Sequence, residues 1–367
     1  MSAINIAVLS GDGIGPEIMA ETLKVLAAVS QKFRLTFDFC PALFGGAAYD
    51  QHGHPFPPET QKVCDAADAI LKGPIGGPKY DSIPDVNLRP ERGALLPLRK
   101  RYDTFANYRP VRLPLALQDA SPLKKERLGQ GVDILMIREL VGGIYFGKKE
   151  RGTKVLESKK EIHFALDVME YTEDQVERIA RLAFAEAQKR KVKLHNIHKS
   201  NVLQTSVFWN EVVDRIHKQE FPSVSIEHML VDNAAYQLVV NPSQFRVMLL
   251  ENMMGDILTD QAGGVLGSLG LMPSACIGPQ KAYYEPAHGS APSIAGQNIA
   301  NPYSMIGSAA LMLEKSFGQP AAAEAIWNAL FAVFGAGYRT KELASSVTPG
   351  AKIVSTSRFG DLVVENL

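Results

Sequence analysis

The chain alternates short apolar runs with longer stretches of helical periodicity. Buried strands are predicted where Val, Ile, Leu and Phe cluster, over residues 4–10, 35–39, 69–72, 134–137, 162–168, 192–197, 226–231 and 246–250. Helical patterns separate several of these runs. The clearest covers residues 172–189, where Thr172 and Gln175 can form a capping box ahead of one apolar face. Such alternation is typical of an α/β protein.

The first strand is followed by a glycine loop, GDGIG, at residues 11–15, and then by a helix that opens with Pro16. A dinucleotide fingerprint G-x-G-x-x-G needs a third glycine where Pro16 stands, so the Rossmann motif is absent. A tight turn and a ligand contact remain alternatives for this loop. Dense prolines and glycines over residues 73–97 predict an ordered surface loop, and residues 142–168 can form an antiparallel arm of the kind that joins two copies.

Composition narrows the class of partner. The 367 residues favour two domains, and 39 basic against 39 acidic residues give no reason to expect nucleic acid or a membrane surface. No apolar run approaches the roughly 20 residues that span a bilayer, and the N-terminus lacks the pattern of a targeting peptide. Three widely spaced cysteines argue against a disulfide framework. A small-molecule partner and a cytoplasmic location are expected.

Asn252, Asp256 and Asp260 follow one another at four-residue steps, which places all three on one face of a helix. Carboxylates beside the apolar, glycine-rich segment that follows need a cation, either a basic side chain or a divalent metal. Asp232 directly follows a predicted strand and can cap the next helix. Together with Asp256 and Asp260 it would supply three carboxylates, enough to hold one Mg²⁺ or Mn²⁺.

Arg99, Arg109 and Arg138 are candidates for binding an anion. Each taken singly is more often part of a structural ion pair, but converging guanidinium groups imply a di- or tricarboxylate ligand. Arg138 ends a strongly apolar strand, where we expect it to face an anion or a buried acid.

Two further residues are candidates for proton transfer. Tyr145, between glycines, can act as a proton donor, and Lys199, after an apolar strand, can relay a proton. Packing is the alternative for the tyrosine. His195 and His198 lack zinc-site spacing and are interpreted as solvated loop histidines. The small residues of 285–302 allow the backbone to approach a planar or phosphorylated ligand closely.

Several motifs taken in order resemble one family, the β-decarboxylating dehydrogenases that include isocitrate and isopropylmalate dehydrogenases. They are GDGIGPE, GPIGGPKYD, RPERGALLPLRKRYDTFANYRP, MIRELVGGIYFG, KSNVL, NMMGDILTDQAGGVLGSLGLMPSA and EPAHGSAPSIAGQNIANP. The form RPERGALLPLRK and the absence of insertions resemble the isopropylmalate branch most. The resemblance implies an isopropylmalate-dehydrogenase-like fold with a mixed sheet in two domains. Residues 1–104 plus 267–367 would form the first, on the cofactor side, and residues 105–266 the second, with the arm, the metal site and the dimer contact.

The resemblance also implies roles for individual residues. Substrate would be bound by Arg99, Arg109, Arg138 and Asp232, with Leu95 and Leu96 against its isopropyl group. Asp256 and Asp260 would hold Mg²⁺ or Mn²⁺ together with Asp232 from the other subunit. Tyr145 and the other subunit's Lys199 would transfer protons. NAD would be bound by Ile14, Gly77, Pro78, Lys79, Glu91, His288, Gly289, Ser290, Ala291, Pro292, Ser293, Ile294 and Asn301.

The implied reaction is the NAD-dependent oxidative decarboxylation of (2R,3S)-3-isopropylmalate to 4-methyl-2-oxopentanoate and CO₂, a step of leucine biosynthesis, in a homodimer with shared sites. Related substrates, namely isocitrate, homoisocitrate and tartrate or malate, are alternatives, as is a non-catalytic regulatory relative. A magnesium-dependent phosphotransferase is disfavoured because no G-x-x-x-x-G-K-[ST] loop occurs. Ser293 stands where NAD-using relatives usually carry aspartate, which leaves the choice between NAD and NADP open, although Ile294 matches the NAD form.

Overall fold

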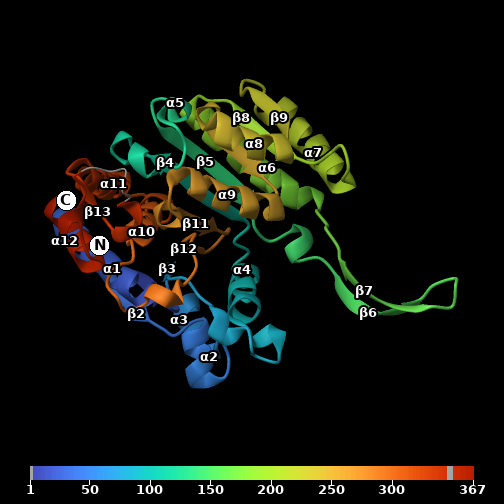
Figure 1. The fold of residues 1–367 in the computed structure, drawn as a ribbon, viewed down its shortest axis with the longest axis horizontal. Coiled ribbons are helices and arrows are strands. Elements are labelled where there is room, and N and C mark those ends of the chain that lie inside the picture. Colours follow the sequence, from blue (N-terminus) through green and yellow to red (C-terminus); the bar gives the residue numbers. More distant parts are fainter. Residues whose placement is uncertain (1–2, 345–349) are drawn as a thin grey trace.

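The computed structural model describes residues 3–344 and 350–367. A ten-stranded mixed sheet crosses the molecule in the order β2-β1-β3-β12-β11-β4-β5-β10-β8-β9 (Figure 1). Its strands are β1 Ile4–Leu9, β2 Phe37–Pro41, β3 Ala69–Lys72, β4 Ala106–Leu113, β5 Val132–Glu139, β8 Leu194–His198, β9 Ile226–Leu230, β10 Val247–Leu250, β11 Pro273–Ile277 and β12 Ala282–Pro286. Neighbouring strands are parallel except where β11 pairs with β12 and β4, and where β4 pairs with β5.

Helices cover the sheet, and nearly every residue of β3, β4, β5, β8 and β10 is buried. Strands that are hidden on both faces in this way read as continuous apolar runs, which explains why most of them are visible in the sequence. The helices are α1 Gly15–Phe33, α2 Gly46–His52, α3 Pro58–Ala66, α4 Leu96–Arg101, α5 Lys125–Leu128, α6 Glu173–Arg190, α7 Gln204–Glu220, α8 Val231–Val240, α9 Asn252–Leu266, α10 Tyr303–Lys315, α11 Pro320–Gly335 and α12 Thr356–Glu365.

The sheet groups its strands by their place in the chain. Strands β4, β5, β8, β9 and β10, from the middle of the sequence, occupy one half, and strands from the two ends occupy the other. The division into two domains, residues 1–104 plus 267–367 and residues 105–266, stays a prediction.

Two short ribbons complete the described structure. One is the predicted arm, in which β6 Lys149–Val155 pairs antiparallel with β7 Glu161–Asp167 and projects away from the body (Figure 1). The other joins β13 Tyr338–Arg339 to β14 Lys352–Ile353. The predicted strand over residues 162–168 therefore exists, but it belongs to the arm and not to the main sheet.

Local expectations agree with the structure at several points. The α/β class is confirmed, α1 carries Pro16 in its first turn, and α6 opens with the capping box of Thr172 and Gln175. The proline- and glycine-rich segment 73–97 is ordered, and it contains short helical turns, among them a π-helix at Glu91–Leu95. In the described part of the chain, no helix is long and apolar enough to cross a membrane.

The C-terminal helix α12 gives a test of the packing around α1, α10 and α11. Phe359 is fully buried on α12, and its ring centre lies 5.4 Å from that of Phe334 on α11. Replacing Phe359 by alanine should lower the free energy of unfolding by about 3–5 kcal/mol, because it leaves a cavity that the helices close only in part. Urea unfolding measures this loss. The matched control is Ile353→Ala, an exposed site where the change should stay within about 0.5 kcal/mol; equal effects would show that α12 is not packed as described.

Candidate active site

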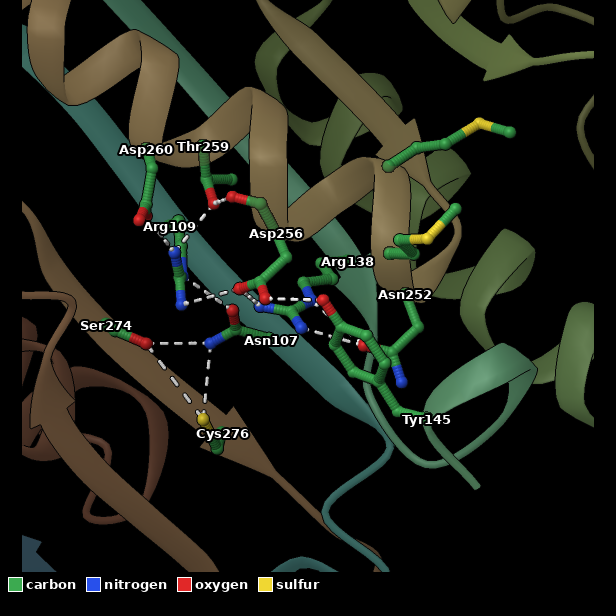
Figure 2. Close-up of polar contacts among 12 residues, drawn as sticks. Asn107, Arg109, Arg138, Tyr145, Asn252, Asp256, Thr259, Asp260, Ser274 and Cys276 are labelled. Atoms are coloured by element: carbon green, nitrogen blue, oxygen red, sulfur yellow. Dashed lines mark hydrogen bonds and ion pairs between the residues drawn. The ribbon is translucent and has the colours of Figure 1, made fainter. Parts of the chain in front are cut away.

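Arg138, near the end of β5, is the centre of the polar network shown in Figure 2. Its side chain is only 1% exposed. The Nε and Nη2 groups donate to Asn252 Oδ1 at 3.1 and 2.8 Å, and Nη1 pairs with Asp256 Oδ1. Asn252 and Asp256 lie one turn apart on α9, so the predicted polar face of this helix is confirmed. The cation that this face was expected to need is the guanidinium group of Arg138. Burial lowers the pKa of Arg138 to about 10, and Asp256 offsets only part of that effect.

The helix approaches Arg138 closely because position 255 is glycine. A Cβ atom on Gly255 would lie 2.7 Å from Arg138 Cγ. Any side chain there would push the arginine or the helix aside, and the two bonds to Asn252 would be lost.

Arg109 reaches the same face from β4. Its Nη1 donates to Thr259 Oγ1 at 2.6 Å and pairs with Asp260 Oδ1 at 3.1 Å, while its Nε donates to Asn107 Oδ1 at 2.9 Å. Asn107 is the register partner of Arg138 in β5, so the pairing of β4 with β5 brings the two arginines together. Arg109 Nη2 is also 3.9 Å from Asp256 Oδ1. Burial acts to raise the pKa of Asp256, but Arg138 and then Arg109 outweigh it and hold that pKa below its ordinary value.

Tyr145 ends the short turn Gly143–Tyr145 and donates its hydroxyl proton to Asp256 Oδ2 at 2.9 Å. Burial, followed by the charge of Asp256, raises the pKa of Tyr145 to about 12. The cation of Arg138 does not reverse this shift. The phenol is therefore protonated near neutral pH and can donate a proton.

These groups surround a cavity of about 590 Å³. Its wall includes Leu95, Leu96, Arg99, Arg109, Tyr145 and Asp256. Arg138 is not among the residues that form this wall. Arg99, on α4, is buried and donates from Nε to the hydroxyl of Tyr283 at 3.0 Å. The cavity thus combines guanidinium groups with an apolar patch, which suits a ligand that carries carboxylates and an alkyl group.

A second cavity, of about 400 Å³, adjoins the first. Both are bordered by His288 and Gly289, and the second also contains the predicted residues Ile14, Ala291, Ile294 and Asn301. The Nε2 atom of His288 is buried and has no hydrogen-bond partner among the described residues. An unpaired buried polar atom is costly, so His288 Nε2, beside both cavities, is a candidate to bind a polar group of a ligand.

The other predicted cofactor residues lie close by. Glu91 is on the wall of the first cavity, whereas Gly77, Pro78, Lys79 and Pro292 border a third of about 290 Å³. Ser290 joins the loops, since its hydroxyl donates to Gly76 O at 2.7 Å and its carbonyl accepts from Ile14 N at 2.8 Å. Lys79 is exposed and pairs with Asp50 at 2.7 Å. Ser293 is exposed.

Lys199 and Asp232 form a separate pair. Lys199 Nζ lies 2.7 Å from Asp232 Oδ1, at the start of α8, and neither residue borders the cavities described above. The bond to Lys199 lowers the pKa of Asp232. Across residues 3–344 and 350–367, no three His, Cys, Asp or Glu side chains come together as a metal site. A single copy therefore brings Asp256 and Asp260 together but leaves Asp232 apart.

Two smaller interpretations are wrong. His195 and His198 are not solvated loop residues, because both are buried in β8, where burial lowers the pKa of each imidazole. Strand β8 ends at His198, one residue later than the strand predicted over residues 192–197, so both histidines belong to the strand. Asp232 does not cap α8 either; Leu230 occupies the cap position and Asp232 lies inside the first turn.

Comparison with known proteins identifies the family. Residues 5–363 match the isocitrate/isopropylmalate dehydrogenase family. The chain belongs to this family. The 3-isopropylmalate dehydrogenase of Moorella thermoacetica is 51% identical over 99% of this chain and 98% of its own length. That of Haemophilus influenzae strain KW20 is 46% identical over 100% and 99% of the two chains.

Solved structures of the family share this fold. Isocitrate dehydrogenase from Methylococcus capsulatus superposes with a TM-score of 0.83 at 31% identity, with 99% of each chain covered. The resemblance stated from the motifs, and the mixed-sheet fold that it implies, are confirmed.

Glu139, next to Arg138, positions the turn that carries Tyr145. Its carboxylate accepts from the backbone N–H groups of Val141 and Gly142 at 3.0 and 2.8 Å. Burial nevertheless raises its pKa from 4.5 to about 7. A folded-state pKa above the unfolded value contributes stability that is complete below pH 4.5 and is lost as the pH rises through 7.

The free energy of unfolding should therefore fall as the pH rises between about 4.5 and 7, by an amount on the order of 3 kcal/mol from this group. Glu139→Gln cannot ionise and should remove that part of the pH dependence. Urea unfolding at a series of pH values measures the slope. The exposed Glu157→Gln should keep the wild-type slope; identical slopes for all three proteins would contradict the assignment.

Proposed function

We propose that the protein catalyses the oxidative decarboxylation of (2R,3S)-3-isopropylmalate to 4-methyl-2-oxopentanoate and CO₂, with NAD as oxidant and a divalent metal, in leucine biosynthesis. The observation that carries the proposal is the composition of the first cavity, where Leu95 and Leu96 share a wall with Arg99 and Arg109. Relatives named 3-isopropylmalate dehydrogenase at 46–51% identity support it.

The cavity favours this substrate over isocitrate. Arginine forks bind carboxylates through paired, charge-assisted hydrogen bonds, so Arg99 and Arg109 suit the two carboxylates of a malate. The isopropyl group then packs against Leu95 and Leu96. In isocitrate a third carboxylate takes the place of that group, and it would lose its hydration against two leucines without gaining a partner.

The donor set fits a hard cation and a dinucleotide. Asp256 and Asp260 supply the carboxylate oxygens that Mg²⁺ and Mn²⁺ prefer, and Asp232 of a second copy would complete the set. The two cavities that His288 borders, with the third cavity beside Gly77 and Pro78, would provide an extended site for NAD. When bound, the metal supplies Lewis-acid polarisation and NAD accepts the hydride.

The protein's own groups position the substrate and move protons. Arg99 and Arg109 orient the diacid, and Asp256 holds the Tyr145 hydroxyl at 2.9 Å, aimed at the cavity that Tyr145 borders. Because its pKa is about 12, Tyr145 keeps its proton until a carbon or oxygen of the substrate accepts it. Lys199 of a second copy would take the proton from the substrate hydroxyl.

The separation of Lys199 and Asp232 from the rest of the site supports the proposal of a homodimer. The Asp232 side chain is 64% exposed, and large apolar side chains are exposed near it on α8 and α9, with Tyr236 and Ile257 each 61% exposed. Exposed apolar groups on two packed helices are typical of a protein interface.

The three cysteines form no disulfide with one another, which fits a reducing cytoplasm.

The purified protein should reduce NAD when given 3-isopropylmalate and Mg²⁺ or Mn²⁺, and a chelator should abolish the absorbance change at the nicotinamide band. A panel of isocitrate, tartrate and malate, each with NAD and NADP, ranks the substrates and settles the cofactor that Ser293 leaves open. Preference for isocitrate, or turnover that survives chelation, would contradict the proposal.

Complementation between two inactive variants tests the shared site. Tyr145→Phe and Lys199→Met should each lose about 10²–10⁴-fold in kcat, as expected when a proton-transfer group is removed. In a heterodimer of the two, isolated through two different tags, one site carries both changes and the other carries neither. It should therefore show about half the wild-type activity, because a two-fold dimer has two equivalent sites.

The matched control pairs Tyr145→Phe with Asp256→Asn, whose side chains lie in the same site of one copy. That heterodimer has no intact site and should stay inactive. No activity in the test pair would mean that Lys199 does not serve the other copy. Activity in the control would mean that Tyr145 and Asp256 are not both required in one site.

A further inference from the structure

A buried lysine borders the first cavity and has no role in the chemistry above. Lys72, the last residue of β3, is 1% exposed. Its Nζ lies 2.6 Å from Glu285 Oε2 in β12 and donates to Gly73 O at 2.9 Å. Lys72 and Glu285 are brought together by register, because β3 and β12 run parallel with Leu71 opposite Tyr284. Both residues are part of the cavity wall.

Glu285 has a second cation nearby, and that cation is Arg99. Arg99 Nη2 is 4.0 Å from Glu285 Oε1, against 2.6 Å for Lys72. A buried carboxylate without a close cation is costly, so Glu285 would draw in Arg99 if Lys72 were absent. Although burial acts to raise it, the pKa of Glu285 is lowered by Lys72 first and by Arg99 second.

Among the residues that the structure describes, Arg99 differs from Arg109 and Arg138 in that it has no close carboxylate partner. Arg138 pairs with Asp256 and Arg109 pairs with Asp260. Within the described residues, Arg99 has no carboxylate nearer than the 4.0 Å of Glu285. Its Nε donates to Tyr283, which fixes the guanidinium plane and leaves its terminal N–H groups for a ligand.

We propose that Lys72 is a positioning residue, which holds Glu285 and so leaves Arg99 free to bind a carboxylate of the substrate; this inference rests on the proposed function. Lys72 acts on the substrate only through Glu285. Its loss lets Glu285 and Arg99 close the 4.0 Å between them into a paired ion bridge. The substrate then has to compete with an internal carboxylate for the same guanidinium.

Steady-state kinetics with 3-isopropylmalate tests this through Lys72→Met, which keeps the length and apolar stem of the side chain. The KM for 3-isopropylmalate should rise about ten- to a hundredfold, as expected for one lost charge-assisted contact, while the KM for NAD stays unchanged and kcat falls less than KM rises. An unchanged KM for 3-isopropylmalate would overturn the inference.

The Glu285→Gln background separates positioning from direct contact. With a neutral amide at 285 nothing competes for Arg99, so adding Lys72→Met should leave the KM of the Glu285→Gln enzyme unchanged within about threefold. A lysine that touches the substrate would raise KM in both backgrounds, and that result would overturn the inference. If Lys72→Met alone does not fold, a rise in KM on adding Lys72→Met to the Glu285→Gln enzyme still overturns the inference.

Wild-type turnover separates this inference from the proposed function. An active wild-type enzyme whose Lys72 variants behave otherwise than stated overturns only the role of Lys72. A wild-type protein that does not oxidise 3-isopropylmalate overturns both.

Discussion

The contact between Arg138 and helix α9 is the constraint on which the site depends. A guanidinium with 1% exposure has to be matched by acceptors, and Asn252 with Asp256 supplies them from successive turns. Such a pair adds little net stability, because desolvation consumes most of the attraction. Its effect is to fix position, because removal of Asn252 and Asp256 would leave the charge of Arg138 buried without compensation. The end of β5 and the start of α9 are therefore held in one arrangement.

The remaining polar groups are built on this arrangement. Asp256, held by Arg138, in turn holds Tyr145, and Arg109 enters between Asp256 and Asp260. Under the proposed function Asp256 and Asp260 would hold the metal ion, and Arg109 would bind a carboxylate of the diacid. Asp256 and Asp260 are thus paired with Arg138 and Arg109 inside the site, so these four side chains already lie near the positions that the proposed function requires.

Sequence patterns predicted the strands that bury apolar side chains on both faces. They did not predict the strands that carry polar side chains. The runs that became β1, β3, β5 and β10 are continuous and hydrophobic, and were found. Strands β4, β11 and β12 were missed, because ANYRPVRL, PSACI and AYYEP contain charges, prolines or small residues. These three strands carry Asn107, Arg109, Cys276, Tyr283 and Glu285. Their polar residues, which interrupt the apolar pattern, are also residues of the candidate site.

The candidate site was predicted residue by residue only through the family resemblance. The four-residue spacing alone predicted the polar face of α9. The position of Arg138 at the end of an apolar strand predicted that it faces an acid, which is Asp256. Nothing in the sequence indicated that Lys72 and Glu285 are partners, since 212 positions separate them and the parallel pairing of β3 with β12 is a long-range contact. The separation of Asp232 from Asp256 likewise needs coordinates.

Placement of β12 between β3 and β11 has a consequence for the order of assembly during translation. Strands β4, β5, β8, β9 and β10 are contiguous in the sheet and emerge in one uninterrupted stretch of synthesis, so that half can become structured while the ribosome is still at work. The N-terminal strands β1, β2 and β3 also pair with one another. However, β3 lacks its other neighbour, β12, until more than 200 further residues have been made. Chain growth thus completes the half built from both ends of the chain last, after α9 with Asp256 and Asp260 has been made.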